Sequence, residues 1–331
     1  MEIPLERVVV VLFLVAGACG CASPGPGGHA PLQRYEYAQV LMGVRARAVA
    51  YAPDEAVAKA ACRSAFERVA QLEDAMSDYR PDSELMRLCA RAGQGPVRVS
   101  EDLFRVLSAA REVSQRSGGA FDVTVGPLVQ LWRGARKTHA LPPERELADA
   151  RSRIGWQHVK LDAAARTVEL TTPGMRLDLG GIAKGDAGDE AIKRLRARGV
   201  RSALFEAGGD IVVSDAPPGT NGWQIELPAR DGRPARTIAL ANAAVSTSGD
   251  TAQYVEIAGR RYSHVVDPQT GLGLGEHSVA TVIAPRGITA DALSTAATVL
   301  GPERGMKLIR QYRGANGWIG RSPPRAGAEE N

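Results

Sequence analysis

Two side chains with hard oxygen donors are spaced to lie together near the C-terminal end of the chain. Asp291 and Thr295 are four residues apart in the segment ADALSTAATVLG. If this segment is helical, the spacing places the carboxylate and the hydroxyl on one face. Such oxygens suit Mg²⁺, which takes few protein ligands and keeps waters or binds phosphates. A helix cap and a core-facing threonine would give the same pattern, so a structural role stays open.

A glycine-rich segment with a lysine precedes another expected helix. It runs DLGGIAKG from Asp178 to Gly185. Glycines let a ligand approach the backbone, a helix N-terminus favours phosphate, and Lys184 adds a positive charge. The spacing matches neither the Walker A motif nor the dinucleotide fingerprint. A plain strand–turn–helix connection with a surface lysine is therefore the alternative.

A histidine lies at the end of an expected strand in the segment SHVVDPQTG, where His264 could act as a general base near neutral pH. A structural histidine before a tight turn at Asp267-Pro268 is the alternative. The hydroxyls of STSGD, residues 246–250, do not complete a Ser/His/Asp triad by spacing. The segment GGAFDVTVGP, residues 118–127, joins a flexible backbone to one aromatic and one acidic residue, and it could be merely a loop before a helix.

Helices and strands alternate irregularly around these segments. Periodic apolar residues and capping signals predict helices over 53–76, 100–117, 143–154, 182–195, 290–300 and 302–312. Alternating segments predict strands over 34–50, 159–162, 167–170, 175–179, 202–213, 223–227, 237–241, 253–259, 260–267 and 277–283, with breaks at Met42-Gly43 and Gly208-Gly209. Because helices and strands do not alternate one for one, an α+β fold with a mainly antiparallel sheet is favoured over a doubly wound one.

The composition and net charge exclude several classes of protein. The chain has 331 residues, with 44% apolar and 24% charged residues, which is ordinary for a globular protein and excludes a disordered, collagenous or coiled-coil chain. The net charge is only +4. Basic residues are scattered among acids without a stripe of interleaved aromatics, so nucleic-acid binding is not expected.

The N-terminus is expected to be a targeting segment. The apolar run VVVVLFLV, residues 8–15, is too short to span a membrane as a mature helix, and small residues with Cys19 and Cys21 follow it. This pattern resembles a bacterial lipobox, in which one of the two cysteines would be lipidated. Ordinary secretion and an apolar N-terminal helix are the alternatives. The predicted organisation is a signal peptide at 1–21, a flexible tether at 22–33, one domain at 34–320 and a frayed tail at 321–331.

The remaining cysteines, Cys62 and Cys89, have no zinc-like spacing. In an exported protein they could pair, but two separate buried thiols are favoured.

Taken in order, several segments resemble the ApbE family of FAD:protein FMN transferases. The resemblance runs from about Met42 to Gly301. Its motifs are Met42-Gly43, the MSDY segment ending at Tyr79, GGAFDVTVGPLVQLW, DLGGIAKG, EAGGD, STSGD, RYSHVVDPQTG and ADALSTAATVLG. The resemblance implies a T-fold-like flavin transferase architecture. It also implies a Mg²⁺-dependent reaction that splits FAD, releases AMP and attaches FMN to a threonine hydroxyl of an exported acceptor protein.

The resemblance also implies roles for individual residues. Asp291, Thr295 and the backbone carbonyl of Gly181 would hold Mg²⁺, and His264 would take the proton of the acceptor threonine. The residues implied to line the FAD site are Met42, Tyr79, Ala120, Phe121, Asp122, Asp178, Lys184 and Val265. Some members only hydrolyse FAD to FMN and AMP, and a non-catalytic FAD-binding lipoprotein is a third reading. The lipoprotein would sit at the periplasmic face of a bacterial membrane, with the inner membrane favoured.

Three positions depart from the family pattern. Val44 replaces the common Thr after Met-Gly, Cys89 stands where Asn is frequent, and Asp186 replaces the usual aromatic residue after AKG. The first two put a local hydrogen bond in doubt, and the third could alter a contact with flavin or acceptor. No departure removes an implied Mg²⁺ ligand, so we expect an active enzyme.

Overall fold

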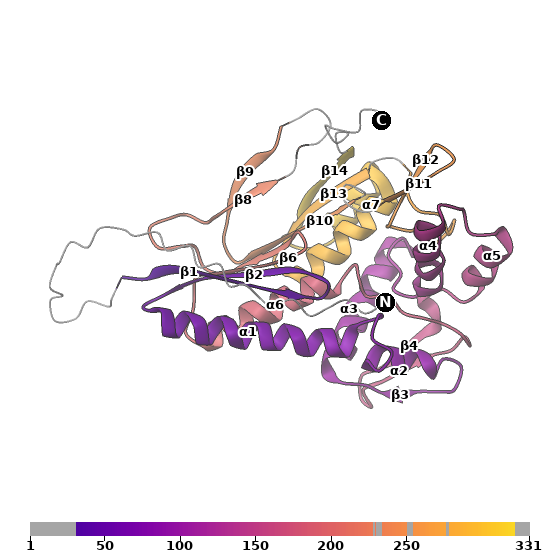
Figure 1. Cartoon of the computed structure of the whole chain (residues 1–331), viewed down its shortest axis with the longest axis horizontal. Helices are drawn as coiled ribbons and strands as arrows, with labels where there is room; N and C mark the ends of the chain where they lie inside the picture. Colours follow the sequence, from indigo (N-terminus) through magenta and orange to yellow (C-terminus); the bar gives the residue numbers. More distant parts are fainter. Residues whose placement is uncertain (1–30, 228, 230–233, 250–253, 276–277, 322–331) are drawn as a thin grey trace. The chain divides into compact units, whose positions relative to one another are not determined.

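The computed structural model describes residues 31–227, 229, 234–249, 254–275 and 278–321 (Figure 1). Residues Leu32–Asn331 form one compact unit, separate from Met1–Pro31. The expected signal peptide with Cys19 and Cys21, most of the tether and the tail after Arg321 lie outside the described residues, and those assignments stay predictions. Among the residues that are described, no helix is both long and apolar enough to cross a membrane.

A seven-stranded sheet forms the centre of the Leu32–Asn331 unit, in the order β1-β2-β6-β7-β10-β13-β14. Every neighbouring pair in it is antiparallel. The strands are β1 (Gln33–Leu41), β2 (Val44–Ala52), β6 (Ala203–Ala207), β7 (Asp210–Val213), β10 (Ala243–Gly249), β13 (Ser278–Ala284) and β14 (Asn316–Arg321). The α+β fold with a mainly antiparallel sheet is thereby confirmed.

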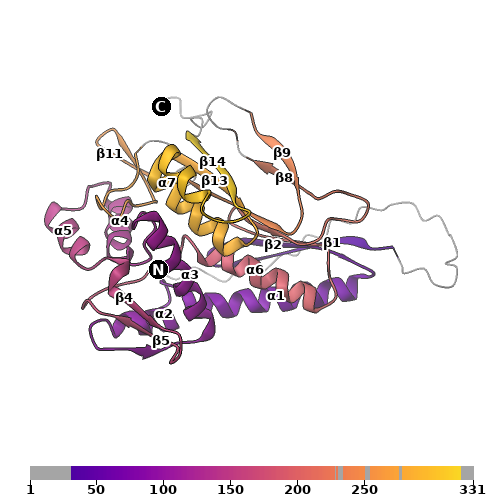
Figure 2. The same cartoon turned by 180° about the vertical axis from the view of Figure 1, so that it is seen from behind.

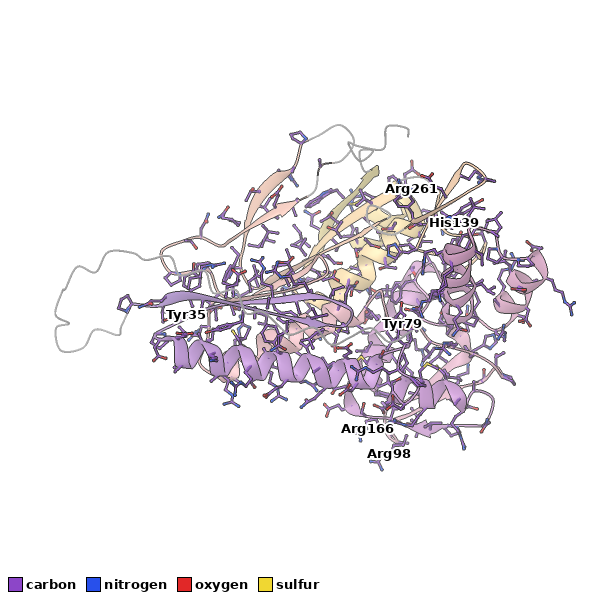
Figure 3. The ribbon with its side chains drawn as sticks, in the orientation of Figure 1. Tyr35, Tyr79, Arg98, His139, Arg166 and Arg261 are labelled. Atoms are coloured by element: carbon purple, nitrogen blue, oxygen red, sulfur yellow. The ribbon has the colours of Figure 1, made fainter. Side chains whose placement is uncertain are left out.

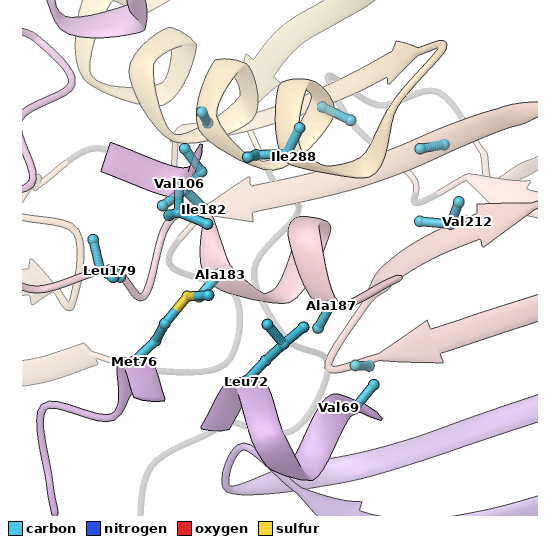
Figure 4. Close-up of a cluster of buried hydrophobic side chains, with 14 of the residues drawn as sticks. Val69, Leu72, Met76, Val106, Leu179, Ile182, Ala183, Ala187, Val212 and Ile288 are labelled. Carbon is cyan, nitrogen blue, oxygen red and sulfur yellow. The ribbon is translucent and has the colours of Figure 1, made fainter. Parts of the chain in front are cut away.

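Three helices cover one face of this sheet: α1 (Glu55–Met76), α6 (Ala183–Ala197) and α7 (Gly287–Ile309). α1 runs alongside β1 and β2 in both views (Figures 1 and 2). The expected cap at its start is present, because Asp54 Oδ1 accepts from the Val57 N–H at 2.8 Å. Small residues let the helices approach closely, as where Leu72 and Met76 of α1 face Ala183 and Ala187 of α6 (Figure 4).

A two-stranded hairpin covers the other face. It consists of β8 (Trp223–Leu227) and β9 (Arg236–Leu240). Trp223, Ile225 and Leu227 pack in one buried cluster with side chains of the sheet such as Val49 and Val245. The alternating buried and exposed positions of β8 match the pattern expected for a strand with one face in water.

The remaining elements form two groups beside the helical layer. The first contains α2 (Glu84–Ala90), α3 (Glu101–Ser117) and the three-stranded sheet of β3 (Val97–Arg98), β5 (Thr167–Leu170) and β4 (Val159–Asp162). The second contains α4 (Gly126–Thr138), α5 (Glu144–Ser152), the short 3₁₀ helix η1 (Trp156–His158) and the hairpin of β11 (Tyr254–Ile257) and β12 (Arg260–Ser263). In the second group Trp132 of α4, Leu147 of α5 and Tyr262 of β12 share a small core.

The predicted strand at 175–179 is wrong. Met175, Leu177 and Leu179 are buried at alternate positions, which explains the pattern. Within the described residues, the segment nevertheless pairs only through an isolated bridge between Val125 and Arg176, because its backbone packs on the start of α4. A Cβ on Gly126 would lie 2.5 Å from the Arg176 carbonyl oxygen.

The helices predicted at 290–300 and 302–312 appear as one helical run that is interrupted at Gly301, whose φ is 75° and ψ is −179°.

Cys62 and Cys89 are both free and buried, so the favoured reading of two separate thiols is confirmed. Burial raises the pKa of Cys62 to about 12.

Candidate active site

Two tight turns meet at one end of the seven-stranded sheet. Met42-Gly43 joins β1 to β2, and Gly208-Gly209 joins β6 to β7, each between directly paired strand residues. All four turn residues have positive φ, as a two-residue turn between twisted strands requires. Met42 adopts this backbone, at φ 52°, without being glycine, and such strain is often found at functional sites. A Cβ on Gly208 would lie 3.1 Å from a methyl carbon of Val44, so the two turns touch.

The first turns of α6 and α7 pack against each other beneath this end of the sheet. A Cβ on Gly185 would collide with the carbonyl oxygen of Gly287, so the crossing depends on a residue without a side chain. Asp189 of α6 then caps α7, because its carboxylate accepts from the N–H groups of Gly287 at 2.6 Å and Ile288 at 3.2 Å. The crossing places Asp291 of α7 beside the start of α6.

Three residues that can supply oxygen ligands lie together at this crossing. Asp291 Oδ2 accepts a hydrogen bond from the Gly185 N–H at 3.0 Å. Gly181 lies just before α6, which begins at Ala183 with Ile182 as its N-cap, so its carbonyl is outside the helix hydrogen-bond ladder. Thr295, one turn after Asp291, lies against Gly181, where a Cβ would be 2.9 Å from the threonine Oγ1. The residues Gly181, Asp291 and Thr295 are thus brought together.

This donor set fits Mg²⁺ by its chemistry. It offers one buried carboxylate, one hydroxyl and one backbone carbonyl, which are all hard oxygens. No group of three His, Cys, Asp or Glu side chains that could hold a metal occurs within the described ranges. An ion that keeps several waters or binds phosphates therefore suits the site better than a metal that needs a full set of protein side chains.

A partly buried ion pair lies next to these oxygens. Lys184 Nζ is 2.8 Å from Asp210 Oδ2 and 3.8 Å from Asp291 Oδ2, and it donates to the carbonyl oxygen of Gly180 at 3.2 Å. Ser246 Oγ donates to Asp210 and lies 3.0 Å from Ser294 Oγ. Sequence reasoning missed Asp210 as a site residue, although it ends the EAGGD motif; its signal was a carboxylate directly after two turn glycines.

The pKa values of Lys184 and Asp291 are shifted by burial and by the charges of their neighbours. Burial alone would lower the pKa of Lys184, but the carboxylates of Asp291 and Asp210 outweigh it and raise that pKa. Burial and the charge of Asp210 raise the pKa of Asp291, and Lys184 opposes them only in part. With two carboxylates and one lysine, the cluster carries a net negative charge when all three ionise, which favours a cation between it and a phosphate.

The segment implied to line the FAD site before α4 is held rigidly. Asp122 is only 7% exposed, and its carboxylate accepts from Thr124 N at 2.8 Å, Thr124 Oγ1 at 2.7 Å and Trp156 N at 2.9 Å. Burial raises the pKa of Asp122, partly offset by the hydrogen bonds from Thr124. This carboxylate is therefore committed to the loop itself. Its neighbours Ala120 and Phe121 are also buried.

Asp178 connects this segment to α6. Its N–H donates to the carbonyl oxygen of Val123 at 2.8 Å, and its Oδ1 accepts from the Gly180 N–H at 2.8 Å. Its other oxygen lies 3.3 Å from Nη2 of Arg133. Tyr79, labelled in Figure 3, follows α1 and is 75% exposed, with the Arg133 guanidinium 4.1 Å from its ring centre.

His264 and Val265 belong to the long connection between β10 and β13. This connection leaves the sheet after Gly249 and returns at Ser278, at the end where the two turns lie. Val265 is buried and its N–H donates to Ser263 Oγ at 3.0 Å, whereas His264 is half-buried. Trp132 of α4 holds the connection, because its Nε1–H donates to the Gly271 carbonyl oxygen at 2.8 Å. The implied site residues thus form two groups. Gly181, Lys184, Asp291 and Thr295 lie around α6 and α7, whereas Phe121, Asp122, His264 and Val265 lie in the segments next to α4 or held by it.

The profile of the ApbE family matches residues 42–318, which include both groups of site residues. The chain belongs to the ApbE family.

Known ApbE proteins match over most of their length. A Treponema pallidum protein named FAD:protein FMN transferase is 33% identical over 328 residues, covering 94% of this chain and 89% of its own. A Klebsiella pneumoniae protein of the same name is 34% identical over 284 residues, covering 84% and 86%. The apo flavinyl transferase ApbE of Pseudomonas stutzeri has the same fold, with a TM-score of 0.78 and 31% identity over 88% of this chain and 93% of that one.

The three departures from the ApbE pattern have structural explanations. Cys89 keeps a local hydrogen bond, because its Sγ accepts from the Leu177 N–H at 3.3 Å. Val44 packs against Gly208 between the two turns. Asp186 is buried and paired with Arg105 of α3, at 3.1 Å from Nε and 2.7 Å from Nη2. This ion pair joins α3 to α6, and the carboxylate of Asp186 is occupied by it.

Proposed function

We propose that the chain transfers FMN from FAD to a threonine hydroxyl of an acceptor protein, with release of AMP. Membership of the ApbE family and relatives named FAD:protein FMN transferase support this activity. The observation that carries the proposal is the proximity of Gly181, Asp291 and Thr295 to one another, beside the partly buried Lys184–Asp210 pair. Phosphoryl transfer needs positioning and charge neutralisation more than covalent chemistry, and this cluster offers both.

Different residues would bind the metal ion, the phosphates and the ring systems of FAD. Gly181, Asp291 and Thr295 would hold Mg²⁺, which when bound would neutralise charge on the diphosphate. Lys184 keeps its proton beside two carboxylates and presents a fixed positive charge at the start of α6. The buried Phe121 and Val265 and the exposed Tyr79 offer apolar and aromatic contacts for the ring systems.

His264 would act as the general base for the threonine hydroxyl of the acceptor. It takes the proton from the threonine hydroxyl, and the threonine oxygen forms a bond to the phosphorus that carries riboflavin. The bond from that phosphorus to the bridging oxygen breaks, and AMP leaves with this oxygen. The half-buried position of His264, in a connection that begins and ends at the site end of the sheet, supports this role.

The test mixes the protein with FAD, Mg²⁺ and an acceptor that carries a threonine flavinylation segment. We expect the intact mass of the acceptor to increase by one FMN, with one AMP released for each. AMP without a mass gain on two different acceptors would indicate an FAD hydrolase. Bound FAD without either product would indicate a flavin carrier, and both results would contradict the proposal.

A variant of His264 tests the proton step separately. His264→Ala is expected to reduce FMN transfer by about 10²–10⁴-fold, the usual contribution of a general base. The affinity for FAD should stay close to that of the wild type, since the base acts on the acceptor. A fall in FAD affinity that accounts for the whole loss of rate would contradict this role.

We propose in addition that the protein is a lipoprotein at the periplasmic face of a bacterial membrane. The apolar run at residues 8–15 followed by Cys19 and Cys21 supports it. An acceptor at the same membrane face would then be reached without diffusion through the bulk phase.

A further inference from the structure

Tyr79 is an aromatic residue that the fold leaves outside its core. It is 75% exposed and follows the end of α1 at Met76 (Figure 3). The guanidinium of Arg133 lies over its ring, with the Arg133 carbon Cζ 4.1 Å from the ring centre. One face of the ring is therefore covered by a cation, and the exposure shows that much of the remainder is open to solvent.

Arg133 is itself held in place by two carboxylates from different segments. Its Nη1 lies 2.6 Å from Asp78 Oδ2, and its Nη2 lies 3.3 Å from Asp178 Oδ2. The guanidinium fork can contact both carboxylates while its flat face stays on the ring, which an ammonium group cannot do. The Nε of Arg133 is buried and has no hydrogen-bond partner in the described part of the chain.

The contacts of Arg133 also lead towards the start of α6. Asp178 continues through Gly180 into the start of α6, where Lys184 and the oxygen cluster lie. Arg133 therefore couples the exposed ring of Tyr79 to the segment that leads into the reaction centre. An exposed tyrosine adds little to the core, so fixing its orientation has its main effect on a molecule that stacks on the open face.

We propose that Arg133 is a positioning residue for FAD, acting through Tyr79. It holds the ring of Tyr79 so that the open face receives a planar ring of FAD, either the isoalloxazine or the adenine. Fixing the side chain before the ligand arrives lowers the entropic cost of binding. The inference rests on the proposed function, because it takes FAD to be the ligand.

The test measures the dissociation constants of FAD, FMN and AMP for the full chain in the presence of EDTA. The variants are Arg133→Met, Arg133→Lys, Tyr79→Leu and the double variant Arg133→Met/Tyr79→Leu. Lys137→Met is the matched control, since it removes one exposed positive charge from the same helix. Arg133→Met should weaken FAD binding by about fivefold, the size of a cation–π contact with some loss of order.

Three further results are expected if Arg133 acts through the ring. Arg133→Lys weakens FAD binding nearly as much as Arg133→Met, although it keeps the charge. In the Tyr79→Leu background, Arg133→Met changes the constant by less than about twofold. Loss of affinity for FMN but not AMP identifies the isoalloxazine as the stacked ring, and the reverse identifies the adenine.

Other outcomes would overturn the inference. They are additive effects of Arg133→Met and Tyr79→Leu, an equal effect of Lys137→Met, and a lowered melting temperature with unchanged FAD affinity. The last result would leave Arg133 a purely structural ion-pair partner. Binding of FAD by a wild type that transfers no FMN would contradict the proposed function alone, because the binding comparison needs neither metal nor acceptor.

Discussion

At the scale of single residues, the cluster around Lys184 works by burying opposite charges close together. Asp210 and Asp291 are 6% and 2% exposed, and among the described residues Lys184 and a few hydrogen bonds offset the cost of their burial. A buried carboxylate without full compensation binds a cation more readily than one in water. The affinity of this cluster for a cation therefore depends on its charge balance as much as on its oxygen ligands.

The Thr295 hydroxyl tests the metal assignment with little change of shape. Thr295→Val should raise the Mg²⁺ concentration needed for half-maximal AMP release by at least about tenfold, because one oxygen donor is lost. Thr298→Val is the control: it removes a hydroxyl from the next turn of α7, where Thr298 Oγ1 donates to the carbonyl oxygens of Ser294 at 2.8 Å and Ser248 at 3.2 Å. Equal Mg²⁺ dependence in the two variants would contradict the assignment of Thr295.

Asp291→Ala should abolish turnover at any Mg²⁺ concentration, since it removes the only charged donor of the set. The measurement is AMP release with FAD binding followed in parallel. Undiminished turnover would refute the metal site.

Part of the site could be predicted from residue types and spacing. Asp291 and Thr295 are four residues apart on one helix, so local geometry alone places them together. Asp210 and Arg133 could not be found in this way, because their partners Lys184, Asp78 and Tyr79 are 26 or more residues away in the numbering. Only the antiparallel topology and the packing of α4 bring these pairs into contact.

At the scale of elements, the crossing of α6 and α7 sets the position of the oxygen cluster. The contact of Gly185 with Gly287 sets the distance between the helices, and Asp189 of α6 caps α7. Both contacts lie within two turns of Asp291. A change in either contact therefore shifts the carboxylate relative to Lys184.

The cap at Asp189 predicts a pH dependence of stability. Burial raises the pKa of Asp189 from 3.8 to about 6, although the N–H groups of Gly287 and Ile288 and the charge of Arg286 oppose it. The folded protein therefore binds more protons than the unfolded chain between about pH 4 and pH 6. The contribution of this group is fully present below pH 4 and is lost as the pH rises through 6.

Asp189→Asn removes this titration while keeping an oxygen that can accept from α7. The free energy of unfolding should therefore fall from pH 4 to pH 7 by up to about 3 kcal/mol more in the wild type than in the variant. Urea unfolding at several pH values measures this free energy for the wild type and for Asp189→Asn. A difference between the two proteins that stays constant over this range would show that Asp189 does not titrate as described.

Helix α4 links the two groups of site residues, since it carries both Arg133 and Trp132. Trp132→Phe removes the hydrogen bond to Gly271 but keeps a ring near Tyr262, whose centre is 5.1 Å away. It should cost about 1–3 kcal/mol of stability. It should also slow FMN transfer several-fold with little change in FAD affinity, because the segment that follows His264 loses its anchor.

Trp223→Phe is the matched control for this prediction. It removes a similar bond, from Nε1 to the Asp215 carbonyl oxygen at 3.0 Å, on the opposite face of the sheet. Transfer rates that fall equally in both variants would attribute the effect to stability alone.

The elements themselves were predictable to different degrees. α1 and α3 were found because each has a capping residue and a long apolar periodicity. The helix after the loop at 118–127 is expected only as an alternative and without bounds, because that loop is glycine-rich and α4 has no side-chain cap. β10 and β14 are not predicted, because serine, glycine and asparagine break their alternation. The segment 175–179 shows the opposite error, since alternate burial does not require a neighbouring strand.

At the scale of the whole molecule, the compact unit begins at Leu32 and its first strand begins at Gln33. β1 runs from there towards Met42, so the start of the unit lies at the end of the sheet opposite the two turns. Within this unit, the first strand residue and the two turns are therefore separated by the length of β1.

This arrangement predicts that anchoring and catalysis are separable. Cys19→Ser/Cys21→Ser should move the protein from the membrane fraction to the periplasmic fraction, because no cysteine at the expected cleavage site would remain for acylation. One of the two single variants should have the same effect and so identify the lipidated residue. A chain from Leu32 to Asn331 should keep the wild-type melting temperature and rate of FMN transfer, since the packed unit begins at Leu32. Membrane association of the double variant would contradict the lipoprotein assignment, and loss of transfer in the truncated chain would place part of the site in residues 1–31.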